Sequence, residues 1–324
     1  MMILAYAESW PIRGKFTISR GSKTSAEVIV VECHKNGQKI GWGEAVPYNH
    51  YGESIAQSLQ QIEKIKDKIQ NRLTRAELIS LMPQGAARNA IDCALWDLES
   101  KEKNMPVWRL AGLPEPKPMI TAYTISYKSS IEMGQDAAMH AHRPLLKIKL
   151  SKEDDLERIE NVHKNAPNSK IIVDANEAWT LEILERLAPK LTDLNVVLIE
   201  QPLPADQDND LIGKAFQVPL CADESCRKIE DLTDLAKKYQ YINIKLDKTG
   251  GLTHAIDFVK EAQRLNLKIM IGCMVATSLS MAPSMLLGAY ADFIDLDGPL
   301  LLEKDRENAI YFDHSLMYPS AIWG

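Results

Sequence analysis

The sequence has few cysteines, no long apolar run and no signal-peptide pattern. Its five cysteines lack the Cys-x-x-Cys spacing of zinc and redox motifs, so a small scaffold held by disulfides or zinc is excluded. No stretch approaches the roughly 18 apolar residues that span a bilayer, and the first 16 residues lack a basic region followed by an apolar one. We therefore expect a leaderless, cytoplasmic protein without a membrane anchor.

Signatures of nucleotide and nucleic-acid binding are also missing. The formal net charge is −6, and no run of basic residues provides a footprint for a phosphate backbone. The pair Gly250-Gly251 lacks both the phosphate-loop lysine and the Gly-x-Gly-x-x-Gly spacing of dinucleotide sites. Nucleic acid is not an expected partner.

The chain has 324 residues, 45% of them hydrophobic and 25% charged, which suits about two globular domains. After residue 115, apolar β-branched runs alternate with helical patterns, as in a parallel βα protein. We expect strands at 120–125, 145–150, 171–175, 196–200, 220–223, 241–246, 268–273 and 293–296, with helices at 153–164, 181–194, 230–239 and 253–265. Eight strands favour a βα barrel, with an open doubly wound sheet as the alternative.

The first 115 residues have a different pattern. Short alternating runs broken by glycine predict antiparallel strands at 2–9, 15–18, 27–33 and 38–44. Helical patterns follow at 54–70, 75–81 and 85–103. We predict an α+β capping domain at 1–115, joined by the tail 310–324, and a barrel domain at 116–309, with the proline-rich segment 112–118 as linker.

Five charged residues stand at or near the ends of consecutive predicted barrel strands. They are Lys149, Asp174, Glu200, Asp223 and Lys245. Each residue alone could be a solvated charge or a helix cap. In a barrel, however, the carboxyl ends of the strands converge on one mouth, where active sites lie. The joint pattern therefore predicts a common site.

The three carboxylates in this group indicate a metal site. Burying Asp174, Glu200 and Asp223 close together is costly unless a cation is present. With no His or Cys at matching strand ends, these hard oxygen ligands favour one Mg²⁺, for which Mn²⁺ can substitute. Three carboxylates also leave room for water and for a substrate carboxylate.

The two lysines would flank these three strands and could act on the two faces of one carbon. Lys147 lies two residues before Lys149, hence on the same face of its strand. A like charge at that distance is expected to lower a lysine pKa, which makes a neutral lysine base plausible. The alternative is that Lys147 is a solvated charge at the strand end.

The last predicted strand ends in Asp295-Leu296-Asp297, where the period of two places both carboxylates on one side. One reading is a pair of caps before Gly298-Pro299. The other is a receptor for a substrate ammonium group.

Taken together, these motifs resemble the enolase superfamily, in its muconate lactonizing enzyme subgroup, and within it the dipeptide epimerases of the L-Ala-D/L-Glu type. The resemblance covers essentially the whole chain. It rests on residues 85–98 (GAARNAIDCALWDL), 147–149 (KIK), 174–176 (DAN), 200–202 (EQP), 222–225 (ADES) and 245–251 (KLDKTGG). It implies a modified (β/α)7β barrel with an α+β cap built from the N-terminal part and the C-terminal tail.

The resemblance also implies roles for individual residues. Asp174, Glu200 and Asp223 would bind Mg²⁺, while Lys149 and Lys245 would remove and return the α-proton through an enolate that the metal stabilises. The neighbours that would orient them are Lys147, Asn176 and Glu224. The substrate contacts would be Asp295 and Asp297 on the dipeptide ammonium, Thr124, and Lys23, which takes the place of the family's arginine in the mobile loop 19–25.

We therefore predict a cytoplasmic, Mg²⁺-dependent isomerase that epimerises dipeptides at the C-terminal residue, most readily L-Ala-D/L-Glu, in the reuse of cell-wall peptides. The alternatives on the same scaffold are an N-acylamino acid racemase, an o-succinylbenzoate synthase or a cycloisomerase. A non-catalytic metal and metabolite binder is a further alternative. The expected partner is a small-molecule dipeptide, and a homo-oligomer is compatible with the sequence.

Overall fold

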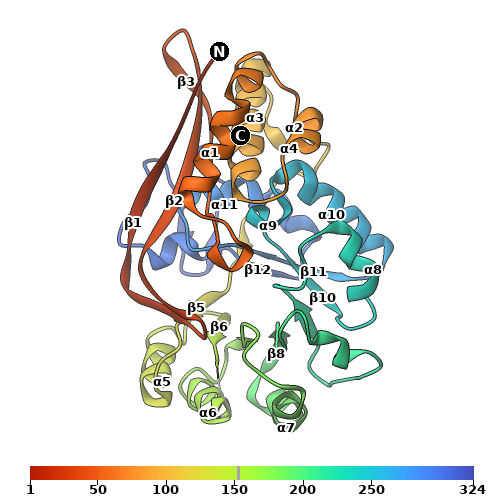
Figure 1. The fold of residues 1–324 in the computed structure, drawn as a ribbon. Helices are drawn as coiled ribbons and strands as arrows, with labels where there is room; N and C mark the ends of the chain where they lie inside the picture. The colour runs from red at the N-terminus through yellow and green to blue at the C-terminus, as the bar shows by residue number, and fades with distance from the viewer. Residues whose placement is uncertain (152–153) are drawn as a thin grey trace.

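The computed structural model describes residues 1–151 and 154–324. It contains an α+β cap formed by the N-terminal part of the chain and a parallel barrel formed by the rest, with the C-terminus returning beside the helices of the cap (Figure 1). No helix in the described ranges is long and apolar enough to cross a membrane.

The cap sheet consists of β1 (Met2–Ile18), β2 (Gly21–Lys35) and β3 (Gln38–Ala45), paired antiparallel in that order. The runs expected at 2–9 and 15–18 form one long strand, because the irregularity between Pro11 and Phe16 shifts the register without ending the pairing. The long hairpin of β1 and β2 therefore reaches from the cap down to the barrel strands (Figure 1).

The cap helices are α1 (Ile55–Gln70), α2 (Arg75–Leu81), α3 (Ala86–Lys103) and α4 (Val107–Leu110), preceded by the 3-10 helix η1 (Asn49–Tyr51). The Ser54 side chain accepts from the Gln57 amide at the start of α1. Helix α3 lies so close to β3 that a Cβ at Gly43 would be 2.3 Å from the Ala90 carbonyl oxygen. Glycine in β3 thus allows the close packing of this helix on the sheet.

The barrel strands are β5 (Tyr123–Ile125), β6 (Leu145–Lys149), β7 (Lys170–Asp174), β8 (Val196–Glu200), β9 (Leu220–Ala222), β10 (Tyr241–Ile244), β11 (Lys268–Gly272) and β12 (Phe293–Asp295). They are parallel and lie in chain order. The Ala122 amide donates to the Ile294 carbonyl at 2.8 Å, across the seam between β12 and the segment before β5. The barrel is therefore nearly closed, which confirms the predicted βα barrel and excludes the alternative of an open sheet.

The strand expected at 120–125 is divided in two. Its first part, β4 (Met119–Ile120), pairs with β14 (Leu316–Met317), which pairs with β13 (Phe312–Asp313) of the C-terminal tail. The end of the tail also reaches the cap, where the indole of Trp42 donates to the Ile322 carbonyl at 2.9 Å. The tail therefore contacts both the cap and the start of the barrel.

The barrel helices are α5 (Ser130–Met139), α6 (Asp155–Asn165), α7 (Leu181–Leu191), α8 (Leu232–Leu235), α9 (Leu246–Thr249), α10 (Leu252–Arg264) and α11 (Ser278–Met285). The 3-10 helices are η2 (Thr192–Leu194), η3 (Asp208–Leu211), η4 (Ile229–Asp231), η5 (Gly288–Tyr290) and η6 (Gly298–Leu301). Glu153, the first residue of the helix expected at 153–164, lies outside the described residues.

The prediction of a single helix at 230–239 is wrong. The chain forms η4 and the short α8 there, and Lys238 and Tyr239 then turn inward to Asp208. Lys238 Nζ lies 2.7 Å from Asp208 Oδ1, and the Tyr239 hydroxyl donates to Asp208 Oδ2 at 3.0 Å. These buried polar contacts replace the last turns of the helix.

Apolar side chains fill the barrel at the opposite end from the charges. One cluster is contributed by residues on or next to the strands, namely Ala122, Leu145, Ile172, Leu198, Cys221, Tyr241 and Met270. Because side chains alternate along a strand, this layer supports the charged side chains that point inward nearer the carboxyl ends. The fold thus concentrates the polar groups at one mouth.

Candidate active site

The charged residues at the strand ends do meet at one mouth of the barrel. Lys149, Asp174 and Glu200 are the last residues of β6, β7 and β8, and the ladder pairs them side by side. Asp223 follows β9 and Lys245 follows β10, one residue beyond strands that are shorter than predicted. All five are at most 7% exposed, so they form one buried polar cluster.

The two predicted acid–base lysines contact different carboxylates. Lys149 Nζ donates to Asp174 Oδ2 at 2.6 Å, and Lys245 Nζ donates to Asp223 Oδ2 at 2.7 Å. Their strands, β6 and β10, are separated by three others in the sheet. The two amines therefore approach the mouth from different parts of the barrel, as an acid–base pair acting on two faces requires.

Lys147 lies at the centre of the cluster and is 1% exposed. Its Nζ lies 2.6 Å from Glu200 Oε2, 2.7 Å from Asp295 Oδ2 and 3.1 Å from Asp174 Oδ2. Burial acts to lower the pKa of Lys147, but the carboxylates, Asp295 above all, outweigh it and raise that pKa well above its usual range. Lys147 is therefore a buried counter-ion, and the alternative of a solvated charge is excluded.

Repulsion between neighbouring lysines does not lower the pKa of Lys147 or of Lys245. Burial also acts to lower the pKa of Lys245, but Asp223 raises it above its usual range. Conversely, burial raises the pKa of Asp174, and Lys149 and Lys147 outweigh it and lower that pKa to about 2. At both lysines the facing carboxylates, chiefly Asp295 for Lys147 and Asp223 for Lys245, outweigh the repulsion between like charges.

Lys248 is a member of the cluster that sequence reasoning missed. Its Nζ donates to Asp223 Oδ1 and to the Asp223 carbonyl, both at 2.6 Å, and to the Asn243 carbonyl at 2.9 Å. It is only 4% exposed. The available signal was its position three residues after Lys245, in a helical turn that brings both amines to one carboxylate. Lys248 holds Asp223 in place.

The three carboxylates of the cluster are candidate ligands for a cation. Within the described ranges, no three carboxylate, imidazole or thiol groups are gathered as closely as the ligands of one metal ion, because lysine amines separate them. Burial and the nearby Asp174 raise the pKa of Glu200 to about 8, and its Oε2 has no aligned hydrogen bond in the described chain. The site therefore offers three carboxylates, and the charge of one of them, Glu200, is not fully balanced by the neighbouring lysines. Such a set of oxygen ligands fits a hard divalent cation.

The two aspartates at the last barrel strand are buried but have different partners. Asp295 ends β12 and is paired with Lys147, whereas Asp297 Oδ2 accepts from the Thr124 amide at 2.6 Å. Burial, and then the charge of Asp295, raise the pKa of Asp297 to about 7. Within the described residues Asp297 thus makes no ion pair with a lysine, and it lies next to the predicted contact Thr124.

The loop expected to read the substrate side chain is the tip of the β1–β2 hairpin. Lys23 belongs to β2 and is exposed, with its Nζ 5.4 Å from the centre of the Tyr48 ring. Partial desolvation of its ammonium group by the surrounding chain lowers the pKa of Lys23. It makes no ion pair within the described part of the chain, and it is not joined to the carboxylate cluster.

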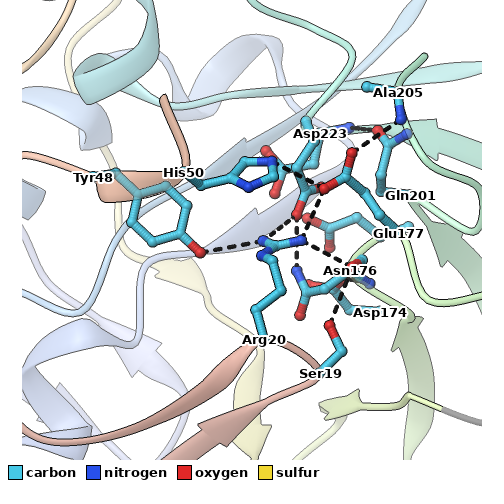
Figure 2. Close-up of polar contacts among 12 residues, drawn as sticks. Ser19, Arg20, Tyr48, His50, Asp174, Asn176, Glu177, Gln201, Ala205 and Asp223 are labelled. Atoms are coloured by element: carbon cyan, nitrogen blue, oxygen red, sulfur yellow. Dashed lines mark hydrogen bonds and ion pairs between the residues drawn. The ribbon is translucent and has the colours of Figure 1, made fainter. Parts of the chain in front are cut away.

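Arg20, which sequence reasoning passed over, reaches the mouth instead. Its guanidinium contacts Glu177 and Glu224, the backbone of Asn176 and the hydroxyl of Tyr48 (Figure 2). The only sequence signal was its place three residues before Lys23. Long side chains at a hairpin tip can point to either side, so sequence could not select between the two cations.

Two of the three neighbours predicted to orient the site, Asn176 and Glu224, contact each other. Asn176 Nδ2 donates to Glu224 Oε1 at 3.2 Å, and the Asn176 amide donates to Asp174 Oδ1 at 3.0 Å. Gln201 was not predicted, yet its Oε1 accepts from the Asp223 amide at 2.9 Å. Asn176 and Gln201 have positive φ values of 44° and 35°, a strained backbone next to the strand ends.

The cap contacts the segment that carries Lys245. Asp247 accepts from Asn89 Nδ2 on α3 at 3.0 Å and from the Val46 amide at 2.9 Å. The guanidinium of Arg88 donates to the carbonyls of Gly250 and Thr249 at 3.0 and 2.7 Å. These contacts join the cap motif 85–98 to the barrel motif 245–251.

A capped βα barrel with buried lysines and carboxylates at its mouth defines an enzyme class that moves protons at carbon. Residues 2–112 match the mandelate racemase / muconate lactonizing enzyme N-terminal domain, and residues 132–310 match the enolase C-terminal domain-like model. The chain belongs to the mandelate racemase / muconate lactonizing enzyme family of the enolase superfamily.

Two similar relatives have different names. A protein of Pseudoalteromonas sp. named N-acetyl-D-glutamate racemase is 45% identical over 92% of this chain and 95% of its own length. The L-Ala-D/L-Glu epimerase of Escherichia coli K12 is 41% identical over 96% of this chain and 97% of its own. Both are isomerases that act on a glutamate-containing compound.

Solved structures give the same family. A protein of Agrobacterium tumefaciens, described as homologous to dipeptide epimerases and bound to sodium and L-Ala-L-Glu with an ordered loop, has a TM-score of 0.96 and 46% identity over 99% of each chain. A dipeptide epimerase of Enterococcus faecalis, complexed with Mg and L-Leu-L-Tyr, has a TM-score of 0.89 and 26% identity over 98% of this chain and 96% of its own.

Proposed function

We propose that this protein is a Mg²⁺-dependent dipeptide epimerase that inverts the α-carbon of the C-terminal residue, with L-Ala-D/L-Glu as its principal substrate. The observation that carries the proposal is the placement of Lys149 and Lys245, which enter one buried mouth from strands separated by the three carboxylate strands. The activities of the similar proteins named above support this substrate class.

In the reaction, one lysine amine takes the α-proton from one face of the substrate carbon. The other lysine, as an ammonium group, gives a proton to the opposite face, and the configuration is inverted. In the reverse direction the two lysines exchange roles. Lys147 keeps Glu200 and Asp174 in place, and its buried positive charge offsets the negative charge of the carboxylates in the mouth.

Asp174, Glu200 and Asp223 would hold the Mg²⁺ ion. When bound, the ion supplies positive charge for the substrate carboxylate, which lowers the cost of removing the neighbouring α-proton. Lys248 and Gln201 hold Asp223 through its side chain and its amide, so this carboxylate keeps its orientation as the ion and the substrate enter.

The ends of the substrate would be read by different parts of the chain. Asp297 would bind the dipeptide ammonium group, because it is a carboxylate near a strand end that has no lysine partner among the described residues. Lys23 would receive the side-chain carboxylate of glutamate, because it is a cation of the hairpin without an ion pair in the described chain. We place the reaction in the cytoplasm and in the breakdown of cell-wall peptides.

The test is ¹H NMR of L-Ala-L-Glu with enzyme and Mg²⁺ in D₂O, beside L-Ala-L-Asp, L-Ala-L-Leu and L-Ala-L-Phe. We expect loss of the C-terminal α-proton signal and growth of the diastereomer, fastest for the glutamate peptide. Absence of exchange with every dipeptide would contradict the proposal, and retained Mg²⁺ binding in that case would indicate a non-catalytic binder.

A second candidate is racemisation of N-acylated glutamate. One observation favours it, namely the 45% identity to a protein named N-acetyl-D-glutamate racemase. The same two lysines and carboxylates would serve, but the substrate has no ammonium for Asp297 to bind. Incubating N-acetyl-L-glutamate in parallel separates the candidates, because the ammonium contact of Asp297 predicts that the free dipeptide is turned over much faster.

A further inference from the structure

Arg20 lies at the tip of a hairpin that crosses the barrel mouth. The hairpin stem is attached to the loop after β5, where the Tyr127 amide donates to the Thr17 carbonyl at 3.0 Å. The tip is attached to the loop after β7, where the Ser19 hydroxyl donates to the Asn176 carbonyl at 3.1 Å. The hairpin thus spans the mouth from one side of the predicted site to another.

The guanidinium of Arg20 makes four hydrogen bonds to groups on three separate segments of the chain. Nη1 donates to the Asn176 carbonyl at 2.8 Å and to Glu177 Oε2 at 2.9 Å. Nη2 donates to Glu224 Oε1 at 2.6 Å and to the Tyr48 hydroxyl at 3.1 Å. Figure 2 shows the side chain of Arg20 pointing from the hairpin into this group. The planar fork of arginine suits such a set of acceptors, whereas lysine provides a single point of charge.

Two of these partners adjoin predicted cation ligands. Asn176 lies two residues after Asp174, and Glu224 follows Asp223 directly. Both partners are at most 5% exposed, and they share a hydrogen bond with each other. Arg20 therefore bridges the loops that follow β7 and β9, next to two of the three carboxylates.

The positive charge of Arg20 balances the buried carboxylate of Glu224. The Glu224 side chain is 2% exposed, and its ion pair with Arg20 is the one that it makes within the described chain. A buried carboxylate beside other carboxylates is costly without a positive partner. If the hairpin moved away, Glu224 would lose this partner. Closure of the hairpin and the charge balance of the mouth are therefore coupled through one side chain.

We propose that Arg20 is a positioning residue that latches the hairpin over the mouth and aligns the two loops next to Asp174 and Asp223. The proposal rests on the proposed function in one respect, that the mouth is the active site. The latch itself is independent of the substrate, because all its partners belong to this chain.

The first test follows the hairpin by limited trypsin digestion of the full-length protein without substrate, with cleavage after Lys23 measured by mass spectrometry. We expect Arg20→Ala to accelerate this cleavage about 10-fold or more, since it removes several charged hydrogen bonds. Arg20→Lys should be intermediate. Lys15→Ala, which removes an exposed cation from the same hairpin, should be cleaved at the wild-type rate.

The second test measures kcat and KM for L-Ala-L-Glu and the Mg²⁺ concentration for half-maximal protection against thermal unfolding. We expect Arg20→Ala to reduce kcat/KM about 10- to 100-fold and to raise the half-maximal Mg²⁺ concentration several-fold, because the loops are no longer aligned. Arg20→Lys should recover only part of each loss. Lys15→Ala should match the wild type.

Equal rates of cleavage after Lys23 in Arg20→Ala and the wild type would overturn the latch. Faster cleavage with unchanged kcat, KM and Mg²⁺ protection would overturn the positioning role. If the wild type itself did not turn over any dipeptide, the proposed function would fail, while the cleavage and Mg²⁺ measurements would still decide the role of Arg20. Cleavage accelerated equally at sites throughout the chain would indicate general unfolding and would count against the latch.

Discussion

The ammonium group of Lys147 lies 2.7 Å from Oδ2 of Asp295, joining β6 to β12 across the seam of the barrel. This contact separates two aspartates that look equivalent in sequence. Asp295 neutralises a lysine of the central cluster, whereas Asp297 accepts a hydrogen bond from the Thr124 amide and makes no ion pair within the described residues. The two aspartates are therefore expected to respond differently to substitution.

Asp297→Asn should raise KM for free dipeptides by about 10- to 100-fold, the usual loss when one partner of a buried charged pair is removed. It should have little effect on any turnover of N-acetyl-glutamate, which has no ammonium group. Asp295→Asn should impair both substrates, because it leaves Lys147 less well paired. Rates measured by ¹H NMR with both compounds check this. An equal loss for both substrates in Asp297→Asn would contradict the ammonium contact.

The two lysines should each act on one stereoisomer. Lys149→Ala and Lys245→Ala are each expected to abolish epimerisation, with losses of about 10²- to 10⁴-fold for removal of an acid–base group. Each variant should still exchange the α-proton of one isomer in D₂O, since the remaining lysine faces one side of the carbon. Separate incubations of L-Ala-L-Glu and L-Ala-D-Glu test this, with Lys128→Ala as the control. Turnover of both isomers in either variant would exclude the two-base scheme.

Removal of Mg²⁺ with EDTA should abolish turnover, and adding Mg²⁺ or Mn²⁺ should restore it. At about 100 times its dissociation constant, a bound ion should stabilise the fold by about 2.7 kcal/mol. Thermal unfolding with and without Mg²⁺ measures this. Glu200→Gln should lose both effects, because it removes a carboxylate that Lys147 only partly neutralises. Stabilisation by Mg²⁺ that persists in Glu200→Gln would place the ion elsewhere.

The pH dependence should follow Asp297. Burial and Asp295 raise the pKa of this carboxyl to about 7. Below that pH the carboxyl is neutral and attracts an ammonium group weakly, and above it the carboxylate is charged. KM for free dipeptides should therefore fall as the pH rises from about 6 to about 8. KM of the Asp297→Asn variant should not change in this way, and a wild-type KM that is constant over this range would contradict the assignment.

The contact between the cap and the barrel should be sensitive to a methyl group at Gly251. A Cβ there would lie 2.5 Å from the Cβ of Asp92 on α3, at a φ of 116°. Gly213 also has a positive φ, of 75°, but nothing lies within 4 Å of its added Cβ. Gly251→Ala should lower the free energy of unfolding by about 1–3 kcal/mol more than Gly213→Ala, as measured by urea denaturation. Equal losses would show that backbone strain alone matters.

Much of the fold could be predicted because local patterns and their environment agree. The barrel strands are buried on both faces, so they appear in the sequence as largely apolar runs, and β6, β7 and β8 lie within one residue of their expected bounds. Prediction failed where tertiary contacts replaced a local preference, as at Lys238 and Tyr239, which turn toward Asp208 in place of extending α8.

The sequence by itself determined that five charges would meet at one mouth, because parallel strands place their carboxyl ends on the same side of a barrel. Only the tertiary structure decided which charges face each other. Three ion pairs join segments that are far apart in the chain: Lys147 with Asp295, Lys248 with Asp223, and Arg20 with Glu224. Such contacts depend on side-chain direction and loop course, which neither periodicity nor spacing encodes.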